Sequence, residues 1–195
     1  MCAGITAFSP LRQFGCKRGD RVAVMGLGGV GHMAVKLANS MGADVTVLST
    51  SPGKEEAAVR LGAKQFVATR EPGALDPLAG KFDLIVDTIS AAHDLDKHLT
   101  LLRNFGTMVL LGLPANATAA SPIHASSLVF GNKHLTGSNI GGIPETQEML
   151  DHCGKNGIAA EVEVITADQI NEAYKRMQQG DVRHRFVIDC GSIGA

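Results

Sequence analysis

Two patterns of apolar and polar residues alternate along this chain. Short runs, most of them apolar, predict strands at 21–25, 44–48, 65–68, 82–87, 107–111 and 134–140. Apolar residues that recur every three or four positions predict helices at 34–41, 55–61 and 95–102. Apolar strands that alternate with helices are typical of a parallel sheet covered on both faces. We therefore expect an α/β fold with a doubly wound, parallel, six-stranded sheet.

The pattern changes after Gly142. A helix is predicted at 145–153, a strand at 161–165, a helix at 167–178 and a strand at 185–188. This α+β segment is too short to bury its own apolar faces. We therefore place one domain at residues 4–141 and an incomplete second one at residues 142–195, which needs another part of a protein to pack against.

A glycine-rich turn joins the first predicted strand to the first predicted helix. Its sequence is Gly26-Leu27-Gly28-Gly29-Val30-Gly31. A GxGxxG sequence between a strand and a helix is the dinucleotide fingerprint in the context that it requires. Gly26 makes the tight turn, Gly28 lets the backbone approach the pyrophosphate, and Gly31 lets the helix pack closely on the strand. The N–H groups and the dipole of the helix N-terminus then attract the phosphates.

The end of the second predicted strand indicates which dinucleotide binds. NAD sites usually have Asp or Glu there, about 20 residues past the glycines, to bind the ribose 2′-OH. This chain has Ser49, followed by Thr50, Ser51 and Lys54. Hydroxyls and an ammonium attract a 2′-phosphate, which a carboxylate would repel. The same residues also suit a polar loop that caps the next helix, and the two roles are compatible. We expect NADP(H).

Composition excludes several classes of partner. With 18 basic and 19 acidic residues, the chain has no charge excess that would attract nucleic acid or an anionic membrane. No apolar run reaches the roughly 18 residues that span a bilayer, and no signal peptide is evident. The cysteines are scattered and form no CxxC or disulfide framework: Cys2, Cys16, Cys153 and Cys190. We expect a cytoplasmic protein with reduced thiols.

The histidines show no metal-binding spacing. The seven are His32, His93, His98, His124, His134, His152 and His184. None makes an HxxxH pair, and the adjacent His152 and Cys153 point in different directions on one predicted helix. We expect all seven to be surface or loop residues.

Blocks along nearly the whole chain resemble one enzyme family. They are residues 2–6, 26–32, 49–54, 82–88, 137–150 and 183–189. Together they resemble the cofactor-binding half of zinc-dependent, medium-chain alcohol dehydrogenases, in the NADP-dependent branch similar to cinnamyl alcohol dehydrogenases. The blocks from residue 137 onward are specific to that branch.

The resemblance implies roles for individual residues. Cys2 would be a ligand of the catalytic zinc, and Thr6 would lie beside the nicotinamide as a catalytic-site residue. The implied cofactor contacts, together with residues that directly follow predicted strands, are Gly26, Gly28, Gly29, Val30, Gly31, Ser49, Thr50, Ser51, Lys54, Thr88, Gly112, Ser138, Asn139, Ile140 and Arg185. Residues from about 142 onward would belong to the catalytic domain, and the sixth strand would pair across a two-fold axis in a homodimer.

The family carries a whole catalytic domain ahead of the Cys2 position, whereas this chain begins at Met1. That domain holds the other zinc ligands, the proton-relay hydroxyl and a structural zinc site. A catalytic zinc in alcohol dehydrogenase needs two cysteines and one histidine. We therefore expect zinc in intact relatives but not on this chain alone.

These observations predict an NADP(H)-dependent oxidoreductase that interconverts primary alcohols and aldehydes by zinc-assisted hydride transfer, in a chain without most of the zinc site. A non-catalytic NADP(H)-binding module, a gene remnant and a zinc-free quinone reductase of the same superfamily stay open. A short-chain dehydrogenase is excluded, because it requires Tyr-x-x-x-Lys and the single tyrosine, Tyr174, is followed four positions later by Gln178.

Overall fold

The computed structural model describes residues 1–114, 122–182 and 184–194. The chain divides into two compact units, Met1–Ile158 and Ala159–Ala195. Among the described residues, no helix is both long and apolar enough to cross a membrane.

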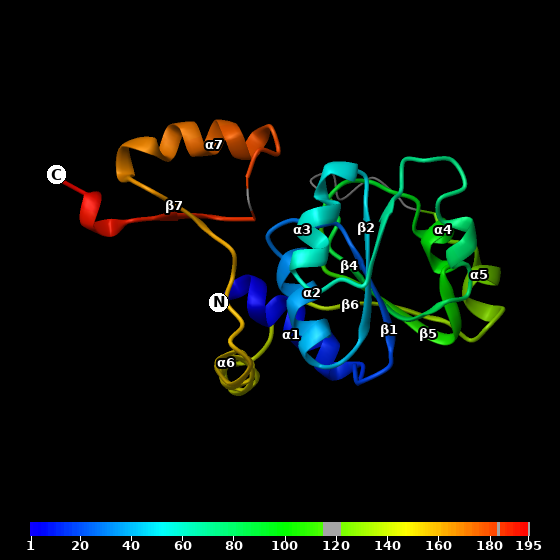
Figure 1. The fold of residues 1–195 in the computed structure, drawn as a ribbon. Coiled ribbons are helices and arrows are strands. Elements are labelled where there is room, and N and C mark those ends of the chain that lie inside the picture. The colour runs from blue at the N-terminus through cyan, green and yellow to red at the C-terminus, as the bar shows by residue number, and fades with distance from the viewer. Residues whose placement is uncertain (115–121, 183, 195) are drawn as a thin grey trace. The chain divides into compact units, whose positions relative to one another are not determined.

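The first unit is built on a six-stranded sheet with the order β3-β2-β1-β4-β5-β6 (Figure 1). Its strands are β1 (Arg21–Met25), β2 (Asp44–Ser49), β3 (Gln65–Ala68), β4 (Phe82–Asp87), β5 (Leu102–Leu110) and β6 (His134–Gly137). Every pairing is parallel. This is the Rossmann strand order, so the predicted doubly wound, six-stranded fold is confirmed.

Helices cover both faces of this sheet (Figure 1). One face packs against α1 (Cys2–Gln13), α2 (Gly31–Ser40) and α3 (Glu55–Arg60), and α6 (Ile143–Asn156) packs against α1 in the same core. The other packs against α4 (Leu95–Leu99), α5 (Ala125–Val129) and the short helix η2 (Asp76–Leu78). Because strand side chains alternate between faces, Val22 and Val24 of β1 join the first core, whereas Ala23 and Met25 join the second.

The helix α1 was not predicted from the sequence. Eight of its residues are buried, among them Ile5, Phe8 and Leu11. A helix that is apolar on most sides lacks the amphipathic period by which a helix is recognised. Pro10, which usually interrupts a helix, lies inside it as well.

Three predicted boundaries near one end of the sheet were wrong. The helix predicted at 95–102 ends at Leu99, and β5 begins at Leu102 instead of Thr107. Leu99, Leu101 and Leu102 are all buried in one core, so hydrophobicity does not change where the helix gives way to the strand. The strand predicted at 134–140 ends at Gly137.

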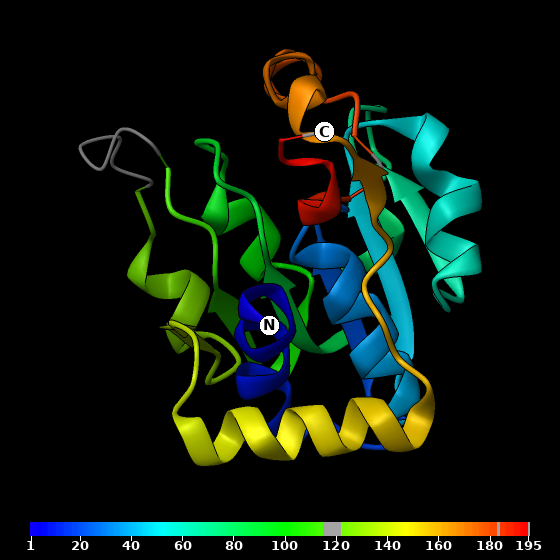
Figure 2. The same ribbon diagram turned by 90° about the vertical axis from the view of Figure 1, so that its left-hand side faces the viewer.

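The helix α6 packs against α1 within the first unit. Figure 2 shows α6 crossing below α1, and Met149 and Cys153 of α6 are buried in the same core as α1. Arg12 of α1 donates to Glu148 of α6 at 2.7 Å. The compact unit therefore extends beyond residue 141, where the first predicted domain ends. That residues 142–195 belong to a catalytic domain stays a prediction.

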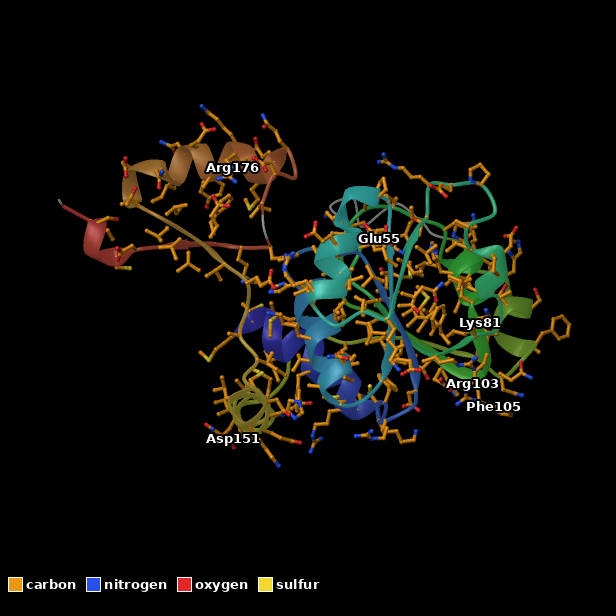
Figure 3. The ribbon with its side chains drawn as sticks, viewed as in Figure 1. Glu55, Lys81, Arg103, Phe105, Asp151 and Arg176 are labelled. Carbon is orange, nitrogen blue, oxygen red and sulfur yellow. The ribbon has the colours of Figure 1, made fainter. Side chains whose placement is uncertain are left out.

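The second unit is a small β-α-β arrangement. Its strands β7 (Glu163–Ile165) and β8 (Phe186–Ile188) pair in parallel, and the short helix η3 (Ala167–Gln169), α7 (Ile170–Gln178) and the short helix η4 (Cys190–Ser192) complete it. Arg176, labelled in Figure 3, donates two hydrogen bonds to Glu163, at 2.5 and 3.1 Å. Its guanidinium also lies 4.9 Å from the centre of the Phe186 ring.

Candidate dinucleotide-binding site

The glycine turn between β1 and α2 is crowded on its inner side. Gly26 has φ +84°, a conformation that favours glycine. A Cβ atom at Gly31 would lie 2.1 Å from the carbonyl oxygen of Gly26. Both positions therefore require glycine for the reasons that the fingerprint predicts, namely the tight turn and the close approach of helix to strand.

The outer side of the same turn is open. Gly28 is exposed, and a Cβ atom there would meet nothing within 4 Å. No side chain caps the N-terminus of α2. Backbone N–H groups at an uncapped helix N-terminus attract anions, and the helix dipole adds to this attraction.

His32 holds this turn from the inside. Its backbone N–H donates to the Gly28 carbonyl oxygen at 3.0 Å, and its ring atom Nδ1 lies 3.2 Å from the same oxygen. The His32 side chain is fully buried. Our expectation that all seven histidines lie at the surface or in loops was therefore wrong for this one.

Polar residues follow the end of β2. Ser49 is its last residue, and its Oγ accepts the backbone N–H of Ser51 at 3.3 Å. Thr50 and Ser51 are exposed. Lys54, in the short helix η1 (Pro52–Lys54), donates from Nζ to the Leu27 carbonyl oxygen at 3.1 Å. This hydrogen bond brings the predicted 2′-phosphate residues to the glycine turn.

The end of β2 carries no carboxylate. Asp44 is at the opposite end of β2, where it pairs with Lys64. Glu55, labelled in Figure 3, begins α3 and is exposed. No Asp or Glu thus ends β2, where an NAD site usually has one.

The loops after β4 and β5 contact the glycine turn and each other. Thr88 donates from Oγ1 to the Met25 carbonyl oxygen at 2.8 Å, and that Oγ1 would lie 3.0 Å from a Cβ atom at Gly26. A Cβ atom at Gly112 would lie 2.1 Å from the Ile89 carbonyl oxygen. The structure therefore brings Thr88 and Gly112 to one sheet edge with the glycine turn.

The loop after β6 lies beside α1. Ser138 donates its N–H to the Leu110 carbonyl oxygen at 3.1 Å. Ile140 has φ +47°, which is rare for a β-branched residue. A Cβ atom at Gly141 would lie 2.8 Å from Cδ1 of Ile5 on α1. The predicted nicotinamide loop (Ser138, Asn139 and Ile140) is thereby next to the helix that carries Cys2 and Thr6.

Cys2 and Thr6 lie one turn apart on α1, with 3.9 Å between Sγ and Oγ1. Cys2 is exposed. Within the described parts of the chain, no three His, Cys, Asp or Glu side chains are grouped so that they could hold a metal ion. These residues therefore do not fit a catalytic zinc site, and we assign no step of a reaction to zinc.

Arg185 lies in the second unit, one residue before β8. Its Nε is buried and has no hydrogen-bond partner among the described residues. Its contact with the pyrophosphate stays a prediction. Arg183, in the same resembling block, lies outside the described residues.

A buried Asp–His pair was missed from the sequence. Asp87, the last residue of β4, is 2% exposed, and its Oδ2 lies 2.8 Å from Nε2 of His93. Both line a cavity of about 670 Å³ at the carboxyl ends of β4 and β5. Burial raises the pKa of Asp87 and outweighs its hydrogen bonds. The signal available in the sequence was an acid at the carboxyl end of β4, directly after three apolar residues.

Comparisons with known proteins agree with this geometry. Residues 29–155 match the family described as zinc-binding dehydrogenase. An NADP-dependent alcohol dehydrogenase C of Mycolicibacterium smegmatis is 54% identical over 99% of this chain and 54% of its own length. Aldehyde reductase YahK of Escherichia coli is 49% identical over 97% of this chain and 54% of its own length. These relatives are named as enzymes.

Solved structures give the same result. A cinnamyl alcohol dehydrogenase from Sorghum bicolor superposes with a TM-score of 0.90 and 40% identity, over 100% of this chain and 54% of that one. One from Helicobacter pylori, complexed with NADP(H), has a TM-score of 0.87 and 38% identity, over 97% and 53%. The chain spans about half the length of the relatives it matches. By its family match and its fold, this chain belongs to the zinc-binding dehydrogenases.

Proposed function

We propose that this chain binds NADP(H) and forms the cofactor-binding part of an oxidoreductase that interconverts primary alcohols and aldehydes. The observation that carries the proposal is the pairing of an open glycine turn with an acid-free β2 end. Gly28 faces solvent above an uncapped helix, and Lys54 lies within hydrogen-bonding distance of Leu27 in the same turn. The names of the relatives in Mycolicibacterium smegmatis and Helicobacter pylori support NADP(H) over NAD(H).

In this proposal the first unit binds and orients the cofactor. The α2 N-terminus and the glycine turn hold the pyrophosphate, while Ser49, Ser51 and Lys54 hold the 2′-phosphate. The loop at 138–140 flanks the nicotinamide and directs it toward Thr6. When bound, the nicotinamide supplies hydride transfer, and the protein supplies position and electrostatic environment. The aldehyde or alcohol would bind beyond α1.

The test is a titration of the purified chain with NADPH and with NADH, followed by nicotinamide fluorescence. We expect NADPH to bind at least about tenfold more tightly, a difference of about 1.4 kcal/mol. Equal affinities for NADPH and NADH would contradict our interpretation that the residues at the end of β2 select NADPH. No binding of either nucleotide would contradict the proposal as a whole and favour a remnant without cofactor function.

We also propose that β6 forms the contact of a homodimer. It is the outermost strand of the six-stranded sheet, next to β5. An unpaired strand edge can be extended by the same strand of a second copy across a two-fold axis. Sedimentation velocity should show a dimer. Ser138 donates its N–H to β5, so the N–H of Gly137 points to the open edge of the sheet. Replacing Gly137 with proline should yield monomers, because proline removes this outward backbone donor.

A further inference from the structure

Asp87 and His93 fasten the loop that follows β4. We call these two residues the β4 clamp. Oδ1 of Asp87 accepts the Ile89 N–H at 2.9 Å, and its Oδ2 lies 2.8 Å from Nε2 of His93. The Asp87 carbonyl oxygen accepts the N–H groups of Leu111 at 2.8 Å and Gly112 at 3.3 Å. One buried residue thus holds both ends of the loop at 88–93 and the end of β5.

This loop contacts the glycine turn at Gly26 and also Gly112, which follows β5. Cγ1 of Ile89 would lie 3.4 Å from a Cβ atom at Gly26, and its carbonyl oxygen 2.1 Å from one at Gly112. Thr88, the preceding residue, donates to Met25 at the entry of the glycine turn. Close-packed groups transmit small displacements, so a loop that moves by a few tenths of an ångström moves the turns as well.

Both ring nitrogens of His93 face an oxygen atom. Nδ1 lies 2.9 Å from the Ala91 carbonyl oxygen, and Nε2 lies 2.8 Å from Oδ2 of Asp87. An imidazole with a hydrogen on Nε2 donates it to the Asp87 carboxylate. The clamp therefore depends on a donor at the end of the His93 side chain.

Few charged groups face the clamp. From α4, His98 lies with its ring centre 5.6 Å from that of His93, and burial lowers the pKa of His98, which keeps this neighbour neutral near pH 7. The same cavity is lined by the titratable residues Asp94, Asp96, Lys97 and His124. Asp96 is paired with His124 at 2.8 Å. Toward the sheet, Asp87 pairs with Met25 of β1 and Leu110 of β5, which carry no charge.

We propose that Asp87 and His93 are positioning residues for the dinucleotide, and that cofactor affinity falls when the hydrogen bond between them is lost. This inference rests on the proposed function. Neither side chain touches the cofactor in this proposal. They act through Thr88 and Ile89, which they hold against the glycine turn and against Gly112.

The test compares NADPH affinity of four chains: the wild type, His93→Ala, His93→Gln and Asp96→Asn. The His93→Ala chain should bind roughly tenfold more weakly, because the loop end is released. In His93→Gln, the amide nitrogen can donate the same hydrogen bond to Asp87. Its affinity should therefore match that of the wild type.

Asp96→Asn is the matched control, since Asp96 lines the same cavity but pairs with His124 instead of the loop. It should keep the wild-type affinity. Circular dichroism checks folding. If His93→Ala does not fold, His93→Leu, which fills the same space without a hydrogen-bond donor, takes its place.

A wild type that binds NADPH no more tightly than His93→Ala does, or a His93→Gln chain that binds as weakly as His93→Ala, would overturn this inference and leave the proposed function intact. A wild type that binds neither NADPH nor NADH would overturn both.

Discussion

The carbonyl oxygen of Gly26 lies 2.1 Å from the position that a Cβ atom on residue 31 would occupy. Gly31→Ala should therefore force α2 away from β1 and destabilise the fold by about 1–3 kcal/mol or more. Urea unfolding measures this loss.

Gly28→Ala is the matched comparison, because a Cβ atom there meets nothing within 4 Å. We expect its unfolding free energy to stay within about 0.5 kcal/mol of the wild type. Its NADPH affinity should nevertheless fall, because the new methyl group occupies the space where the pyrophosphate would approach. Equal stability losses in the two variants would contradict this distinction between the inner and outer sides of the turn.

The end of β2 should control the choice of nucleotide. Ser49→Asp places a carboxylate at the ribose position, and we expect NADPH affinity to fall by about tenfold or more relative to NADH. Lys54→Ala should weaken the binding of NADPH more than the binding of NADH, because it removes the cation nearest the predicted 2′-phosphate. Lys64→Ala is the control, because Lys64 pairs with Asp44 at the other end of β2. It should change neither the affinity for NADPH nor that for NADH. Fluorescence titration with both nucleotides gives the ratio.

Asp83 should make stability depend on acid pH. Burial pushes the pKa of Asp83 upward, but the N–H of Arg21 at 2.7 Å and the Arg103 guanidinium outweigh it, so that its pKa is lowered overall. A lowered pKa contributes stability above the unfolded value of about 3.9, and this contribution is lost as pH falls through the folded value.

We therefore expect Asp83→Asn to cost about 1–2 kcal/mol at pH 7 and progressively less as the pH falls below about 4. Urea unfolding over this pH range measures the difference. Asp151→Asn, at an exposed carboxylate of α6 (Figure 3), controls for the loss of a surface charge. A difference between Asp83→Asn and wild type that does not change with pH would contradict the assignment.

The contact between α1 and α6 should contribute substantially to stability. Met149 is 2% exposed, and Met149→Ala should cost about 2–5 kcal/mol. The neighbouring Leu150 is 41% exposed, so Leu150→Ala should cost less than about 1 kcal/mol. Thermal unfolding of the two variants separates the outcomes. Similar losses would mean that α6 is not held against α1 in solution.

The sequence predicted the sheet well, because its strands differ from their surroundings. The strands at 65–68 and 82–87 have the predicted bounds, since each run is flanked by polar, glycine or proline residues. The helix α1 could not be found in this way, because burial on most sides leaves no polar face to reveal its period.

The candidate site was predictable where chemistry repeats in sequence, as in the glycine turn. Its supporting groups were not. His32 and His93 each act through one partner, Gly28 and Asp87, and only the fold brings the second pair together. A single histidine carries no spacing signal, so its role depends on which strand end it meets.

The left-handed backbone of Ile140 has a consequence for ligand capture. Such a conformation costs about 1–3 kcal/mol for a residue other than glycine and persists only where its surroundings hold it. Here the next residue, Gly141, is wedged against Ile5. A loop that is already held in one shape loses little conformational entropy when a ligand arrives. The loop proposed to flank the nicotinamide is thus held in one shape in advance, and the free-energy cost of that shape is met during folding instead of at each binding event.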